Sequence, residues 1–211
     1  MREELKPYWG FENPRLKEYK DLSLDAKHLY SHYSDRLYGN CGVRHVKEQL
    51  KIALEDSIVF DIGCGTGLSI TGLEAAPKTR ALIGVDLVAK DSYRRIEKTD
   101  VIKVRSDMLQ FLARIYPDSG NFVFNGIDFL QGDYLNTVVR EVERSTKQGG
   151  IVFGVGSEPL VSELERNSSF VDLDPQTKQR QLIEKWRKGD EERIPENLEL
   201  DFFLFRKEEA N

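Results

Sequence analysis

The chain has 211 residues, of which 39% are hydrophobic and 32% charged, with a net charge of −5 and a pI near 5.4. This length suits one sizeable domain, and the composition is that of an ordinary globular protein. The acidic balance argues against a broad nucleic-acid-binding face, and no apolar run approaches the ~20 residues of a membrane span. We therefore expect neither a nucleic-acid partner nor a membrane anchor, and the composition indicates no particular oligomeric state.

The cysteines and the first residues indicate the compartment. Only Cys41 and Cys64 are present, which is too few for a disulfide framework. The opening stretch MREELKPYWG lacks the apolar segment of a secretory signal. A cytoplasmic setting is therefore expected.

Residues 1–45 are predicted to form a lead-in with short helices, the clearest over residues 23–38. Tyr30 and Tyr33 lie on this helix, together with His28 and His32, which are four residues apart on one face. No third ligand is signalled nearby and no HExxH pattern occurs, so a metal site is not expected. A further helix over residues 43–54 leads into the first strand.

The central feature of the sequence is residues 57–68, SIVFDIGCGTGL. An apolar run ends in Asp61 and breaks into glycines at alternate positions. This pattern predicts a buried strand, a glycine-rich turn and then a helix, here over residues 68–75. Such a turn lets a ligand approach the backbone, and the helix offers unpaired N–H groups to an anionic group.

Two ligand classes compete for this turn. In the dinucleotide fingerprint G-x-G-x-x-G the third glycine would occupy the position of Leu68, but it comes one residue earlier here. The carboxylate of Asp61 would repel a pyrophosphate, whereas it suits a ligand with an ammonium group, such as S-adenosylmethionine. A tight glycine turn without any ligand is the third possibility.

Alternating strands and helices follow. A buried strand over residues 81–86 ends in Asp86, about 20 residues beyond the turn, where a carboxylate can accept hydrogen bonds from both ribose hydroxyls. A strand-end turn aspartate is the alternative. Next we predict a charged helix over residues 88–98, a strand over residues 101–105 and a helix over residues 108–116, which Asp107 could cap.

The remaining elements complete the sheet. We predict strands over residues 121–127, 151–156 and 198–206 and helices over residues 133–147, 159–166 and 175–188, with a further strand either missing or near residues 170–173. Repeated strand–helix alternation calls for a three-layer α/β sandwich with a mostly parallel, doubly wound sheet and a final antiparallel strand. We expect a single domain over residues 1–211, with residues 46–156 as the cofactor-binding core and residues 157–211 as the closing helices and strand.

The motif DIGCGTG resembles the D/E-x-G-x-G-x-G signature of class I S-adenosylmethionine-dependent methyltransferases, and the likeness extends over about residues 30–156. YSHYSDRLYGN is similar to the tyrosine-rich segment of many small-molecule members, although aromatic helix packing explains it equally well. The resemblance implies that an acid just after the third strand binds the exocyclic amine of adenine. It also implies that the next residue packs on the adenine ring or bonds to it. It assigns cofactor contacts to Asp61, Gly63, Cys64, Gly65, Gly67, Asp86, Leu87, Asp107, Met108 and Asn125.

The sequence departs from the family at the fourth strand. Asn121 stands where an aspartate is frequent, and Asn125 to Asp128 does not match the N/D-P-P-Y/F motif of amino-methyltransferases that act on adenine or glutamine. We therefore expect methyl transfer to a small-molecule acceptor of unidentified type. A non-catalytic S-adenosylmethionine-binding protein and, less favoured, a nicotinamide-dependent oxidoreductase remain open.

The reaction itself requires no particular catalytic side chain, because the activated methyl group belongs to the cofactor. A base is needed only if the acceptor nucleophile is protonated at working pH. The candidates for that base are Tyr30, His32, Tyr33, Asp128 and Glu158.

Overall fold

The computed structural model describes residues 52–64, 78–87, 89, 91–96, 98–127, 131–173 and 200–209. The expected helices over residues 23–38, 68–75 and 175–188, and most of the helix over residues 43–54, lie outside these residues. So do Tyr30, Tyr33, His28, His32, Gly65, Gly67 and Asp128. Residues 52–54 are helical, as predicted.

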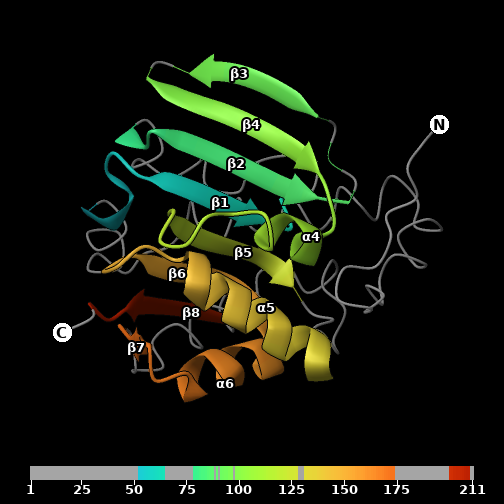
Figure 1. Cartoon of the computed structure of the whole chain (residues 1–211), viewed down its shortest axis with the longest axis vertical. Coiled ribbons are helices and arrows are strands. Elements are labelled where there is room, and N and C mark those ends of the chain that lie inside the picture. The colour runs from blue at the N-terminus through green and yellow to red at the C-terminus, as the bar shows by residue number, and fades with distance from the viewer. Residues whose placement is uncertain are drawn as a thin grey trace, which may run out of the picture.

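The described residues form an eight-stranded sheet in the order β3-β4-β2-β1-β5-β6-β8-β7 (Figure 1). The strands are β1 (Ile58–Ile62), β2 (Ala81–Asp86), β3 (Ser92–Ile96), β4 (Thr99–Arg105), β5 (Asn121–Ile127), β6 (Ile151–Ser157), β7 (Phe170–Asp172) and β8 (Leu200–Lys207). Five of them, β4, β2, β1, β5 and β6, are parallel neighbours, whereas β3, β7 and β8 pair antiparallel. The carboxyl ends of the five parallel strands therefore meet at one edge of the sheet.

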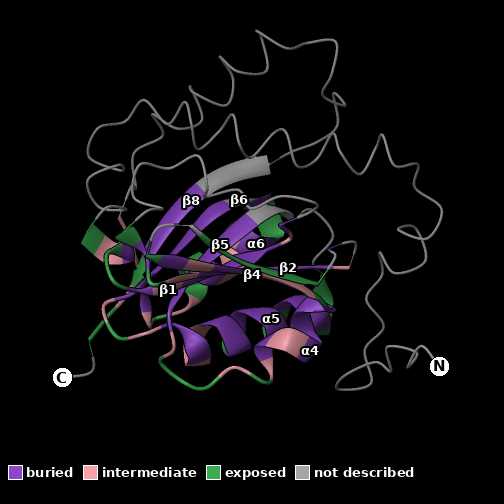
Figure 2. Ribbon diagram, turned by 90° about the horizontal axis from the view of Figure 1, so that it is seen from above, coloured by how far each residue is buried: buried purple, intermediate pink, exposed green. Residues whose placement is uncertain are grey.

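The described helices cover one face of this sheet. They are α4 (Met108–Leu112), α5 (Gly132–Ser145) and α6 (Glu158–Arg166), and Figure 2 shows α4 and α5 on the same side of the strands. The helix expected over residues 108–116 already ends at Leu112, since Arg114 and Ile115 continue in tighter turns whose N–H groups bond three residues back.

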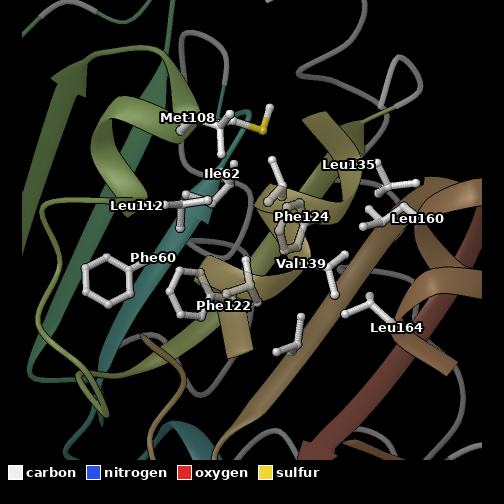
Figure 3. Close-up of a cluster of buried hydrophobic side chains, with 14 of the residues drawn as sticks. Phe60, Ile62, Met108, Leu112, Phe122, Phe124, Leu135, Val139, Leu160 and Leu164 are labelled. Carbon is white, nitrogen blue, oxygen red and sulfur yellow. The ribbon is translucent and has the colours of Figure 1, made fainter. Parts of the chain in front are cut away.

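Alternate residues of each strand point to opposite faces, and both faces carry buried apolar side chains. On the helix face, Phe60 stacks on Phe122 with ring centroids 5.0 Å apart. Figure 3 shows the rings of this face packed against side chains from α5 and α6. The opposite face buries Val59, Val123 and Phe153. Burial on both faces is the property expected of a parallel sheet that is covered on both sides.

The region after β2 differs from the prediction. The helix expected over residues 88–98 is wrong, because Ser92–Ile96 forms the edge strand β3 and makes a hairpin with β4. Ile96 pairs with Thr99, so two residues make the turn. The Tyr93 hydroxyl donates to Asp100 Oδ1 at 2.9 Å across the two strands. Cross-strand pairing with β4 outweighs the helical preference of the charged residues in this stretch.

The closing end of the sheet contains the predicted final strand and also the further strand that the sequence left uncertain. β8 lies between β6 and β7 and runs antiparallel to both, which confirms the antiparallel final strand. β7 occupies residues 170–172, within the stretch proposed for the additional strand. Among the described helices, none is long and apolar enough to cross a membrane.

Candidate functional site

The candidate site lies at the edge where the parallel strands end. Asp61 is the fourth residue of β1, Asp86 is the last residue of β2, and Asp107 follows β4 and begins α4. Their side chains are 1%, 8% and 5% exposed. Topology therefore brings together three of the predicted acids on adjacent strands, as expected from the rule that ligands bind at the carboxyl ends of such sheets.

The first residues of the glycine turn extend the ladder between β1 and β2. The N–H groups of Gly63 and Cys64 both donate to the Val85 carbonyl, at 2.9 and 3.3 Å. Gly63 has a φ of 79°, a conformation that costs other residues free energy because of their Cβ atom. These bonds fix the point at which the chain leaves the sheet. The N–H groups of Gly63 and Cys64 are thus used inside the protein, and ligand contact from these two residues would come through other atoms.

The loop after Asp86 is fastened to the end of β4. The Arg105 side chain donates from Nε to the Leu87 carbonyl at 3.0 Å, and its backbone N–H donates to Asp91 Oδ1 at 2.8 Å. Leu87 is half-buried, whereas Arg105 is exposed. No motif in the sequence singled out Arg105, and only the register of β2 and β4 places it directly beside Asp86.

Asp107 caps α4. Its Oδ1 accepts from the N–H groups of Leu109 and Gln110 at 2.9 and 3.2 Å, and its Oδ2 accepts from the Tyr134 hydroxyl at 3.1 Å. The capping role anticipated from the sequence is therefore confirmed. Met108 is buried in the core beneath α4 and α5 (Figure 3), so core packing is the role that its side chain plays, and contact with an adenine ring stays a prediction.

The other predicted residues lie at the ends of β5 and β6. Asn125 belongs to β5 where the register with β6 shifts between Asn125 and Ile127. Ser157 ends β6 and is the N-cap residue of α6, but its buried hydroxyl makes no hydrogen bond with the described residues. Glu158 is exposed at the start of α6. No sequence pattern singled out Ser157, since strand-end serines are common.

The Cys64 thiol is influenced by its burial and by two of these carboxylates. Burial raises the pKa of the Cys64 thiol well above its ordinary value, and the negative charges of Asp61 and Asp86 raise it further. Cys64 is therefore a neutral, unreactive thiol at physiological pH. Among the described residues, no group of three or more His, Cys, Asp or Glu side chains could hold a metal ion.

Asn121, the departure from the family pattern, lies at the opposite edge. It is fully buried, and its amide nitrogen donates to the Ala53 carbonyl at 2.9 Å and to Ser57 Oγ at 3.0 Å. Its amide oxygen accepts from the Ile151 N–H at 2.8 Å. An aspartate could not donate either of the first two bonds. The asparagine is explained by these structural contacts, so it has no bearing on the site.

Comparison with known proteins identifies the fold. No protein-family model matches the sequence, and a search of curated proteins finds no match. Solved structures do match: a proposed methyltransferase from Streptococcus mutans in complex with SAH aligns at 12% identity with a TM-score of 0.50, covering 78% of this chain and 96% of that one. An rRNA methylase from Streptococcus thermophilus has the same identity and TM-score, covering 79% and 96%. A proposed rRNA methylase from Clostridium thermocellum aligns at 11% identity with a TM-score of 0.50, covering 80% and 97%. The mixed, mostly parallel sheet is that of the class I methyltransferase fold.

Proposed function

We propose that this chain, which has the class I methyltransferase fold, is an S-adenosylmethionine-dependent methyltransferase with a small-molecule acceptor. The observation that carries the proposal is the gathering of Asp61, Asp86 and Asp107 at the carboxyl ends of adjacent parallel strands. Folds alone do not define functions, so the argument rests on these side chains and their chemistry.

The donor and acceptor properties of the site fit this cofactor. Carboxylates only accept hydrogen bonds, and the groups that the cofactor would present to them all donate: an ammonium, two ribose hydroxyls and the exocyclic amine of adenine. A cationic ligand would also relieve the repulsion among buried acids. The pyrophosphate of a nicotinamide cofactor would add negative charge beside Asp61, which argues against the oxidoreductase alternative.

When bound, the cofactor supplies a methyl group activated by the positive sulfonium. The residues of this chain have the tasks of binding it, orienting it and excluding water. Asp61 would hold the amino-acid end and Asp86 the ribose, while Asp107 would recognise the base. Glu158 begins α6 beyond the end of β6 and could take the proton of an acceptor that requires a base. Asp128, the other acidic candidate, lies outside the described residues.

The acceptor class is the less constrained part of the proposal. Two of the structural neighbours are described as rRNA methylases, but a likeness at 11 to 12% identity speaks only for the fold. A net charge of −5 disfavours a polyanionic acceptor, whose binding depends mainly on basic side chains. A small molecule is therefore favoured, with RNA as the alternative that the experiment includes.

The test has two stages. Calorimetric titration with S-adenosylmethionine, S-adenosylhomocysteine and NADH should show binding of the first two alone. Incubation with S-adenosylmethionine tritiated in its methyl group, with a metabolite extract or with total RNA, should then label the small-molecule fraction. Binding of NADH alone would contradict the proposed cofactor. Binding without transfer to either fraction would favour the non-catalytic alternative, and labelling of RNA alone would overturn the acceptor class.

A further inference from the structure

A tyrosine that the sequence did not single out lies against the proposed adenine-binding acid. Tyr134 is the third residue of α5, and its side chain is 6% exposed. Its hydroxyl donates to Asp107 Oδ2 at 3.1 Å. α5 follows β5, so this contact joins two segments of the chain that both begin at the carboxyl edge of the sheet.

Three hydrogen bonds fix the orientation of the Asp107 carboxylate. The first turn of α4 restrains Oδ1 through two backbone N–H groups, and Tyr134 restrains Oδ2 from α5. Because the two oxygens are held by different elements, rotation of the carboxylate about its χ2 axis would break bonds on at least one side. A buried tyrosine hydroxyl requires a partner, and here that partner is the acid on which base recognition would depend.

We propose that Tyr134 is a positioning residue that sets the selectivity for adenine by holding Asp107 in the orientation that accepts from the exocyclic amine. This inference rests on the proposed function. A hydrogen bond to a donor requires correct direction as well as distance, so a carboxylate free to rotate would discriminate less between a base with an amine and a base with a carbonyl oxygen. The same hydroxyl would matter little to a ligand without that amine.

The test compares S-adenosylhomocysteine with S-inosylhomocysteine, which has a carbonyl oxygen in place of the exocyclic amine. Tyr134→Phe removes one hydroxyl and keeps the ring in the core. We expect it to weaken S-adenosylhomocysteine binding about five- to tenfold, because a less restrained Asp107 carboxylate would lose part of its hydrogen bond with the exocyclic amine. Binding of S-inosylhomocysteine, measured by competition, should change less than twofold, so the ratio of the two dissociation constants should fall.

Tyr93→Phe is the matched control, because it removes another tyrosine hydroxyl bonded to an aspartate, on the exposed β3–β4 hairpin. It should leave the ratio unchanged. A second variant, Asp107→Asn, retains a residue that can cap α4. In the Asp107→Asn background, adding Tyr134→Phe should no longer alter the ratio.

The outcomes separate this inference from the proposed function. If the unaltered protein prefers S-adenosylhomocysteine and Tyr134→Phe lowers thermal stability without changing the ratio, the tyrosine only joins α4 to α5 and the inference is wrong. A fall in the ratio with Tyr93→Phe of the same size would contradict it as well. If the unaltered protein binds neither compound, the proposed function fails first and the inference fails with it.

Discussion

Buried polar side chains lie at both ends of the parallel strands. Those at the amino ends differ in kind from those at the carboxyl ends. At the amino ends, Asn121 has both a donor and an acceptor group, and both are used by neighbouring segments. It ties β5 to the end of the preceding helical turn at Ala53 and to the first residue of β6, Ile151. This region stabilises the sheet with contacts supplied by the protein itself.

The carboxyl ends instead collect acids. Asp61, Asp86 and Asp107 can only accept hydrogen bonds, and the charges of the first two are felt by the Cys64 thiol, whose pKa they raise in addition to burial. Like charges gathered in a region of low exposure cost folding free energy. The comparison indicates that the amino ends are held together by a side chain that both donates and accepts, whereas the carboxyl ends present acceptor groups that suit a cationic, donor-rich ligand. Substitutions in the two regions should therefore have opposite consequences.

Asp86→Ala should have the largest effect on binding. Removing the carboxylate would eliminate two hydrogen bonds from ribose hydroxyls to a charged group, so the dissociation constant of S-adenosylhomocysteine should rise about 100-fold or more. The midpoint of thermal unfolding should fall less than in Asn121→Ala, because Asp86 is the last residue of β2, whereas Asn121 bonds three separate segments of the chain. Calorimetry and thermal denaturation measure the two quantities.

Glu165→Ala on the exposed surface of α6 is the control for the change in charge and should alter neither the dissociation constant nor the unfolding midpoint. A large loss of stability with unchanged affinity would show that Asp86 belongs to the stabilising region.

Asn121→Ala should have the reverse effect. Three buried hydrogen bonds would be lost and their partners left without replacement, so the free energy of unfolding should fall by about 2–3 kcal/mol. Affinity for S-adenosylhomocysteine should change less than twofold. Urea denaturation gives the first number and calorimetry the second.

Asn121→Asp sharpens this test. The aspartate that is frequent in the family would still accept from the Ile151 N–H but could not donate to Ala53 or Ser57, and its carboxylate would be fully buried. We therefore expect a loss of stability at least as large as in Asn121→Ala. Asn136→Ala on the exposed face of α5 is the matched control and should leave stability unchanged within about 0.5 kcal/mol. A loss of cofactor affinity in Asn121→Ala would contradict the division between the two regions.

The fold was predictable where hydrophobic runs and turn residues agreed. The strands over residues 81–86 and 121–127 were located to the residue, since each is an apolar run bounded by clear breaks. The local sequence pattern predicted the wrong element at residues 88–98. The strand β3 there is an exposed, charged edge strand, and it forms because it pairs with β4. The preference of a charged stretch for helix is too weak to outweigh that pairing.

The candidate site was predictable only in part. Asp61, Asp86 and Asp107 follow from strand ends, because parallel topology carries each strand end to the same edge. Tyr134 and Arg105 were missed, since the importance of each depends on the group that its side chain contacts, the Asp107 carboxylate or the Leu87 carbonyl, and these contacts join segments far apart in the sequence. Tyr134 had one available signal: it lies in the first turn of a helix that begins at this edge.

The Cys64 thiol gives a smaller, pH-dependent test of the carboxyl ends. Its pKa is raised in the folded protein above the ordinary value of 9.0, so its contribution to stability is fully present below that pH and is lost as pH rises above it. Between pH 8 and pH 10, unfolding free energy should fall about 1.4 kcal/mol more with Cys64 present than in Cys64→Ala. Both proteins should carry Cys41→Ser, so that the comparison isolates Cys64. Equal slopes would mean that this thiol is not held neutral by its surroundings.

Arg105 allows the smallest and most local test, because it lies at the carboxyl ends but outside the group of acids. Its Nε bond to the Leu87 carbonyl holds the loop that follows Asp86, whereas its backbone bond to Asp91 is independent of the side chain. Arg105→Met should therefore loosen only one attachment of the loop and raise the dissociation constant of S-adenosylhomocysteine about threefold, as for one exposed hydrogen bond. Arg94→Met on exposed β3 removes the same charge and should have no effect. If both variants weakened binding equally, the cause would be the overall field of the basic residues. The orientation of the loop would then contribute nothing, and the acids alone would distinguish the carboxyl ends from the amino ends.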